Sequence, residues 1–319
     1  MKNSVPGLQI VGIGLNCVDI LIRLGDMPTW EGSASLRAIR LDGGGPVGTA
    51  LVAAARLGAR VGYVGTIGND AVGALKRQYL SKEGIDTSQV KIRPYTEPNL
   101  VLVFVHEKSA ERVFAIPDDY YKDPLRPDEL DRQYITSADY LHLDGIYGEA
   151  ALQAAKWMRE AGKRVVLDAI KTEGKPDPIL GDIVAWTDVL ISGSAFARGL
   201  TGEDDFLKAS KLILGMGPKI VVETRGDQGS FTVTENEAFH TPAFQVEALD
   251  TTGAGDVFHG AYIYGLIQDW DVRRIATFAT AMAAIKCTRL GGRNGIPNLD
   301  EVNRFLAERN IEVGSKTRP

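Results

Sequence analysis

The sequence of 319 residues predicts an α/β fold: a mainly parallel central sheet with helices on both faces, plus a small β-sheet that projects from it. Two observations carry this prediction. From residue 140 onward, short apolar runs alternate with longer helical patterns, which is typical of βαβ units. Hydrophobic residues make up 44% of the chain, enough to bury a full core. We expect one domain that spans residues 1–319.

The N-terminal part opens with an apolar run ending in glycines, which favours a buried strand at residues 8–14. Pro46 and Gly58 bracket an apolar pattern that predicts a helix at 46–57, because Pro suits the first turn and Gly the end of a helix. The other elements expected here are strands at 18–24, 32–42 and 60–67, a helix at 71–82, and a hairpin of 99–106 with 111–116.

The C-terminal part carries the alternation of strands and helices. Strands are expected at 140–143, 165–168, 189–192 and 219–224, with helices at 149–161 and 204–214 between them. An extended segment at 244–247 precedes three closing helices, expected at 253–267, 271–288 and 299–307.

Two β-rich segments, about 15–42 and 92–117, interrupt this alternation. We expect them to pair into a small sheet that covers a cleft as a lid, although ordinary edge strands of the main sheet are the alternative. A projecting sheet has exposed edges, so a homodimer formed through the lid is expected.

Composition and charge exclude several classes of partner. The formal net charge is −5 and no cluster of Lys and Arg is present, so nucleic acid is not expected to bind. No apolar run reaches the ~18 residues of a membrane helix, and the N-terminal residues do not resemble a signal peptide. The only two cysteines, Cys17 and Cys287, fit a reducing cytosol, so a cytoplasmic protein is expected.

The run DTTGAGD at residues 250–256 is the most informative motif, because it joins an extended segment to a helix. The backbone N–H groups of Gly253, Ala254 and Gly255 can converge on an anion at the helix N-terminus, where the helix dipole adds positive charge. Asp256 follows at the position from which a carboxylate can accept the proton of an attacking hydroxyl group. A plain capped helix N-terminus is the alternative interpretation.

DTTGAGD resembles the signature of the ribokinase-like (PfkB) family of carbohydrate kinases. The runs GGGPVGTA at 43–50 and AAARLG at 53–58 are similar to the N-terminal signature of that family. The likeness covers nearly the whole chain, and its two β-rich segments would form the family's lid. Within the family, KCTRLGGRNGIP at 286–297 and DVFHGA at 256–261 are similar to the sulfofructose kinase branch.

The resemblance implies ATP-dependent phosphorylation of a hydroxyl group of a small sugar or sugar derivative, which is ketose-like and either neutral or acidic. Asp256 would be the general base, and Gly253, Ala254 and Gly255 the anion hole. A nucleoside kinase of the same fold and a non-catalytic sugar-binding regulator are the alternatives, although the regulator is expected to lack the base.

Acceptor-binding residues are expected near the N-terminus. Asp19 matches the family's Asp that binds sugar hydroxyls, and Gly43, Gly44 and Gly45 would let the backbone approach the sugar. Thr49 stands where most members have a substrate-binding Asn. Basic residues that would suit an acidic acceptor are Arg37, Arg40, Arg112 and Lys171, each of which is otherwise a solvated surface charge.

Nucleotide and ion sites complete the expected set. Thr224, Gly226 and Gly229 are similar to the family's ATP-binding turn, with adenine packed near a helix at 277–284. ATP and Mg²⁺ are the implied cofactors, the metal held mostly by phosphate and water. The positions that bind a monovalent cation such as K⁺ in relatives correspond here to Asp250, Thr252 and the backbone of Gly291. We interpret His142, Asp144 and His259 as structural.

Overall fold

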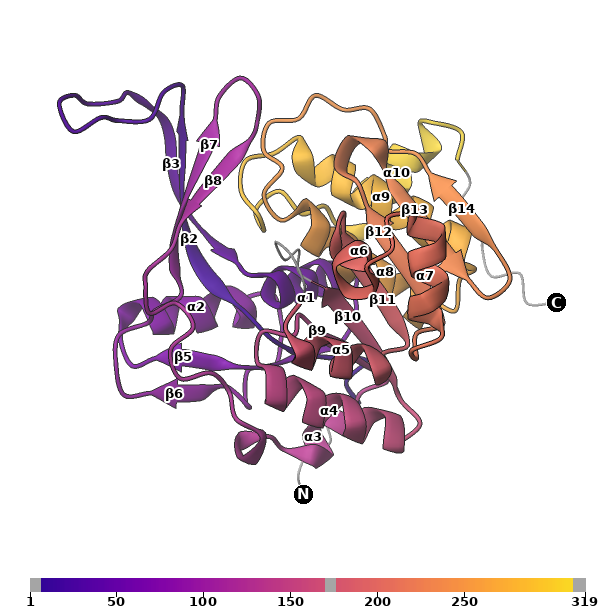
Figure 1. Cartoon of the computed structure of the whole chain (residues 1–319). Coiled ribbons are helices and arrows are strands. Elements are labelled where there is room, and N and C mark those ends of the chain that lie inside the picture. The colour runs from indigo at the N-terminus through magenta and orange to yellow at the C-terminus, as the bar shows by residue number, and fades with distance from the viewer. Residues whose placement is uncertain (1–6, 170–175, 312–319) are drawn as a thin grey trace.

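A computed structural model describes residues 7–169 and 176–311, and its centre is an eight-stranded sheet in the order β14-β13-β12-β11-β10-β9-β1-β4 (Figure 1). Six strands are parallel, and the hairpin partners β13 and β14 are antiparallel. Their bounds are β1 Ile10–Ile13, β4 Val61–Val64, β9 Tyr140–Leu143, β10 Arg164–Ala169, β11 Val189–Gly193, β12 Ile220–Thr224, β13 Ser230–Thr234 and β14 Ala238–Thr241.

Helices cover both faces of this sheet, as the alternation of patterns predicts (Figure 1). One hydrophobic core joins the sheet to α1 (Pro46–Arg56), α8 (Ala254–Ile267), α9 (Val272–Cys287) and α10 (Leu299–Ala307). A second core on the other face joins it to α3 (Arg132–Thr136), α4 (Gly148–Glu160), α5 (Pro178–Ala185), α6 (Phe196–Thr201) and α7 (Phe206–Leu214). The predicted fold class is confirmed.

A separate four-stranded sheet, which we call the lid sheet, rises from one side of the molecule (Figure 1). Its order is β3-β2-β7-β8, and its strands are β2 Cys17–Leu24, β3 Leu36–Gly44, β7 Leu100–His106 and β8 Arg112–Ala115. Strand β2 pairs parallel to β7, so segments about 80 residues apart meet directly; Ile20, for example, pairs with Leu102. The small projecting sheet is thus part of the fold.

Three predicted boundaries are wrong. Residues 60–67 form β4 and β5 (Thr66–Gly68), which belong to different sheets, because the chain turns at Gly65. The second segment of the lid sheet begins at Leu100 rather than at residue 92. The earlier strand β6 (Lys91–Arg93) pairs with β5, beside α2 (Ala71–Ser81), and not with the lid sheet. Residues 244–247 form no strand, because they run along the rim of a cavity instead of a sheet edge.

Among the described residues, no helix is long and apolar enough to cross a membrane.

Candidate active site

Residues 250–256 form a turn, which we call the catalytic turn, and the buried carboxylate of Asp250 holds its backbone in place. Asp250 is fully buried and accepts hydrogen bonds from the backbone N–H of Thr252 and of Gly291, each at 2.8 Å. Gly253 has φ 74°, a conformation that favours glycine, and α8 starts at the next residue. The N–H of Ala254 donates to the carbonyl of Thr251 at 3.3 Å. The helix N-terminus on this braced turn still suits anion binding, because the first N–H groups of a helix lack partners within the helix.

Asp256 lies in the first turn of α8 and is half-buried. Its carboxylate has no hydrogen-bond or ion-pair partner within residues 7–169 and 176–311, so both oxygens can accept a proton from a ligand. Burial raises the pKa of Asp256, while the positive charges of His259, Arg112 and Arg293 oppose that shift. A more basic carboxylate without a competing donor suits a general base.

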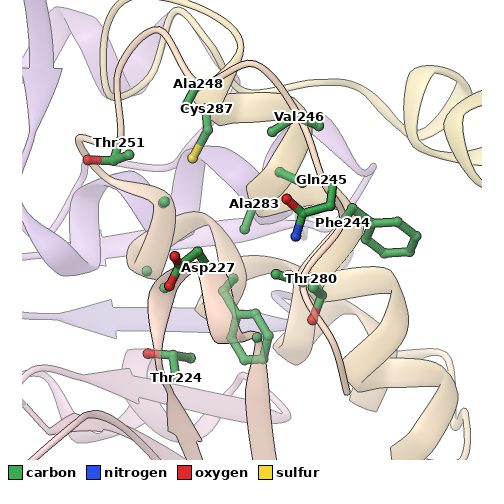
Figure 2. Close-up of a pocket in the computed structure, with 17 residues that line it drawn as sticks. Thr224, Asp227, Phe244, Gln245, Val246, Ala248, Thr251, Thr280, Ala283 and Cys287 are labelled. Atoms are coloured by element: carbon green, nitrogen blue, oxygen red, sulfur yellow. The ribbon is translucent and has the colours of Figure 1, made fainter. Parts of the chain in front are cut away.

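A cavity of about 260 Å³ opens beside the catalytic turn (Figure 2). Thr224, Gly226 and Gly229 line it together with Thr251, Ala254 and Gly255 of that turn. The structure thus brings the predicted ATP-binding residues and most of the predicted anion hole into one space.

Small residues of α9 form one wall of this cavity. Thr280, Ala283 and Ala284 lie there, within the helix expected beside the adenine, and leave room for a flat ring. In Figure 2 the side chain of Gln245 points inward, whereas the ring of Phe244 points away. The ring of Phe244 packs edge-on against that of Phe305, and the two ring centroids are 5.3 Å apart.

The predicted acceptor residues meet where β2 and β3 enter the main domain. Asp19 is buried, and its Oδ1 accepts the S–H of Cys17 at 3.1 Å. A side chain on Gly44 would collide with the Asp19 carboxylate, and Gly45 has φ 86°, so glycine is needed at both positions.

Burial raises the pKa of Asp19 to about 6, and the charge of Asp256 adds to that shift. A Cβ on Gly253 of the catalytic turn would also stand 3.4 Å from Cγ2 of Thr49, so residues predicted from opposite ends of the chain share one site.

Arg293 is a residue of this site that sequence reasoning missed. It is 3% exposed; Nη2 donates to Asn16 Oδ1 at 2.6 Å and to the carbonyl of Gly44, and Nε donates to Thr49 Oγ1 at 3.4 Å. The predicted substrate residue Thr49 is thus buried with its hydroxyl bound to Arg293. Nη1 is buried without a partner among the described residues. The sequence feature that could have indicated this role is the position of Arg293 inside a glycine-rich run, where a long charged side chain is unusual.

Buried titratable groups gather at the carboxyl ends of β9 and β10: His142, Asp144 and Asp168, with His259 of α8 beside Asp168. Asp144 accepts hydrogen bonds from the N–H groups of Leu15 at 2.7 Å and Ile146 at 3.0 Å. His259 lies 3.4 Å from Asp168, and its Nδ1 is 2.7 Å from the carbonyl oxygen of Gly255. These bonds support a structural role for Asp144 and His259. Burial lowers the pKa of His142 to about 3, so that ring is neutral.

The basic residues expected in the lid lie in different places. Arg112 reaches the catalytic turn, where Nη1 donates to Thr251 Oγ1 at 2.9 Å. Arg37 forms an exposed ion pair with Glu107 at 2.6 Å, and Arg40 is exposed on β3. Lys171 lies outside the described residues. Of the three arginines, Arg112 contacts the site.

Comparison with known proteins identifies the family. A family model described as pfkB family carbohydrate kinase matches residues 14–299. The chain belongs to this family. Over 291 residues it is 30% identical to the ATP-dependent ribose-1-phosphate kinase of Halopiger xanaduensis, which covers 91% of this chain and 95% of that relative. It is 26% identical to the deoxyribokinase of Salmonella typhi, covering 94% and 99%.

Solved structures agree with this assignment. The crystal structure of ribokinase from Thermotoga maritima superimposes with a TM-score of 0.79 at 27% identity, covering 94% of this chain and 99% of that one. The chain is therefore a phosphotransferase that acts on a sugar hydroxyl group, and the ribokinase-like fold is confirmed.

ATP and Mg²⁺ are the cofactors that fit this ATP-dependent family. Within the described residues, no three His, Cys, Asp or Glu side chains gather to hold a metal ion. The residues present therefore suit an ion that is held mainly by phosphate oxygens and water, as Mg²⁺ with ATP commonly is. The predicted monovalent-cation position offers no free carboxylate oxygen for an ion. Each oxygen of Asp250 already accepts a hydrogen bond, one from the backbone N–H of Thr252 and the other from that of Gly291.

Proposed function

We propose that this carbohydrate kinase transfers the γ-phosphoryl group of ATP to a hydroxyl group held between Asp19 and Asp256. One observation carries the proposal: the catalytic turn lies between the two sets of predicted residues. It lines the nucleotide cavity, and a Cβ at its Gly253 would stand 3.4 Å from Cγ2 of Thr49, one of the predicted acceptor residues. A nucleotide phosphate and an acceptor hydroxyl can therefore meet at residues 253–256.

In the proposed reaction, Asp19 and the backbone of Gly44 and Gly45 hold the acceptor. Its hydroxyl gives its proton to Asp256 as its oxygen bonds to the γ-phosphorus, and the bond from that phosphorus to the bridging oxygen of ADP breaks. The N–H groups of residues 253–255 stabilise the charge on the transferring group. Mg²⁺, when bound with ATP, neutralises phosphate charge.

We infer that the acceptor is an acidic or phosphorylated sugar. Arg293 and Arg112 both place positive charge near Asp256, and Arg293 has an unpartnered, buried Nη1. The name of the relative from Halopiger xanaduensis, a ribose-1-phosphate kinase, supports the same class. Against a nucleoside acceptor, the lid aromatic Trp30 is fully exposed and Phe114 is half-exposed, so neither offers a stacking pocket.

The test is an ATP-consumption assay with Mg²⁺ over a matched panel. The panel pairs ribose with ribose 1-phosphate, fructose with its 1- and 6-phosphates and with 6-sulfofructose, and glucose with gluconate and 5-dehydro-2-deoxygluconate. Adenosine is added. We expect kcat/KM to be highest for an anionic member of a pair. A neutral sugar as the best acceptor would overturn the acidic class, and consumption with adenosine alone would favour the nucleoside kinase. Binding without turnover would favour the regulator.

We further propose a homodimer through the lid sheet and a cytoplasmic location. Cross-strand partners share a face of a sheet, so Ile22, Ile39, Phe104 and Val113 form one outward row. Ile39 is 62% and Val113 63% exposed, and an apolar patch of this kind commonly marks a protein interface. Both cysteines, Cys17 and Cys287, are free, which suits a reducing compartment.

A further inference from the structure

A buried lysine lies directly beneath the catalytic turn. Lys286, in the last turn of α9, is 0% exposed, and its Nζ donates a hydrogen bond to the backbone carbonyl of Asp250 at 2.7 Å. Asp250 is the first residue of that turn, and its carboxylate braces Thr252 and Gly291. The ammonium group is thus joined to the residue that holds the anion hole in shape.

The surroundings of Lys286 match the place where the family resemblance implies a monovalent cation. The backbone oxygens of Lys286 and Gly291 lie 3.0 and 3.1 Å from the point where a Cβ of residue 295 would stand. Gly295 provides no side-chain oxygen there. Each oxygen of Asp250 already accepts a backbone N–H, so the only unshared side-chain oxygen among the residues expected to bind the ion is the neutral Oγ1 of Thr252. The ligands that remain are neutral oxygens, and the ammonium group of Lys286, bonded to Asp250, repels a second cation. These residues therefore do not fit a bound K⁺.

A buried ammonium group is costly unless nearby groups compensate it, so its position calls for a reason. Burial lowers the pKa of Lys286, and the negative charge of Asp250 opposes that shift. The charge of Lys286 also acts on the Asp256 carboxylate. A fixed cation at this position stabilises negative charge both in Asp250 and on a phosphoryl group bound at the turn.

We propose that Lys286 is a tethered replacement for the monovalent cation, so that the kinase needs no K⁺. Lys286 is a positioning residue here: its ammonium holds the carbonyl of Asp250 and with it the N–H groups of residues 253–255. The inference rests on the proposed kinase function, but its structural part is testable without turnover.

The first experiment uses the wild-type protein at constant ionic strength in KCl, NaCl or choline chloride. We expect kcat/KM and the thermal unfolding midpoint to be the same in all three salts. An increase in kcat/KM of about threefold or more in KCl over choline chloride would overturn the proposal. If no sugar is phosphorylated in any salt, the kinase proposal fails, while the unfolding midpoints still test whether the site binds K⁺.

The second experiment uses Lys286→Ala, which empties the position, and Lys286→Met, which fills it without charge. For Lys286→Ala we expect at least about a tenfold loss of kcat in choline chloride, substantial recovery in KCl or methylammonium chloride, and a higher unfolding midpoint in KCl. Lys286→Met should lose activity without recovery. Normal activity of Lys286→Met would overturn the proposal.

Lys76→Met is the matched control, because Lys76 is also a fully buried lysine but pairs with Glu97 at 2.8 Å instead of with a residue of the catalytic turn. Its activity and unfolding midpoint should respond equally to KCl and choline chloride. A KCl-specific recovery in this control equal to that of Lys286→Ala would show a general salt effect and would also overturn the proposal.

Discussion

Arg112 on β8 of the lid sheet donates a hydrogen bond to Oγ1 of Thr251 in the catalytic turn, at 2.9 Å and across 139 residues of sequence. The same Oγ1 is 3.4 Å from the carbonyl of Ala110, which precedes β8. Both contacts join the lid hairpin to the turn for which we propose phosphoryl stabilisation. We propose that closure of the lid over that turn excludes water, which limits hydrolysis of ATP.

We therefore predict that Arg112→Ala weakens lid closure. A hydrogen bond from a charged group contributes about 1.5–3 kcal/mol, so sugar phosphorylation should fall roughly tenfold or more. The ratio of ATP hydrolysed to sugar phosphorylated should rise, measured by comparing ADP with sugar phosphate produced. Arg40→Ala is the control, because Arg40 is also an exposed lid arginine but does not contact the turn. An unchanged ratio in Arg112→Ala would contradict the prediction.

Asp256→Asn should abolish turnover while leaving nucleotide binding intact. The amide cannot accept the hydroxyl proton, and the loss of a general base typically costs about 10²–10⁴-fold in rate. The cavity walls remain, so the Kd for ATP measured by calorimetry should change little. Asp300→Asn is the matched control and should keep its turnover, because Asp300 also lies in the first turn of a helix but is exposed on α10. Turnover of Asp256→Asn within about tenfold of the wild type would argue against Asp256 as the base.

The residues expected to bind phosphate could be predicted from the sequence, because they lie in short contiguous segments of the chain. Residues 250–256 and 224–229 are contiguous turns next to a helix or strand, and the structure places both on one cavity. Patterns of period 3.6 gave α9 and α10 to within a residue of their ends.

The acceptor end was less accessible because long-range contacts define it. Arg293 contacts Asn16 across 277 residues of sequence and Thr49 across 244. No spacing in the sequence signals that these polar side chains turn inward. The break between β4 and β5 was missed for a related reason: residues 61–68 are uniformly buried, so burial alone does not mark where the chain passes from one sheet to another.

The outward face of the lid sheet should control oligomerisation. Ile39→Glu with Val113→Glu places charges in the apolar row of the lid sheet and should convert a dimer into a monomer, as measured by light scattering after gel filtration. The opposite face holds Leu21 and Val103, both fully buried, so the fold should persist. Lys208→Glu on α7 is the control for the change of charge alone. A wild type that is monomeric at all concentrations would contradict the lid interface.

Asp144 should make stability depend on pH, because burial raises its pKa from 3.8 to about 7. Between these values the folded state binds more protons than the unfolded state, so the free energy of unfolding falls as pH rises and levels off above about pH 7. Asp168 and Asp256 add negative charge nearby and strengthen the shift. Asn at this position cannot ionise, so Asp144→Asn lacks this contribution.

The measurement is urea unfolding of the wild type and of Asp144→Asn at pH 5 and pH 8. Asn retains one acceptor for the N–H groups of Leu15 and Ile146, so the lost hydrogen bond costs about 1 kcal/mol at both pH values. Relative to the wild type, the variant should therefore become more stable as pH increases from 5 to 8. Asp19 and Asp168 titrate in both proteins, so the difference isolates Asp144. A difference that stays constant between the two pH values would show that Asp144 ionises alike in the folded and unfolded chains.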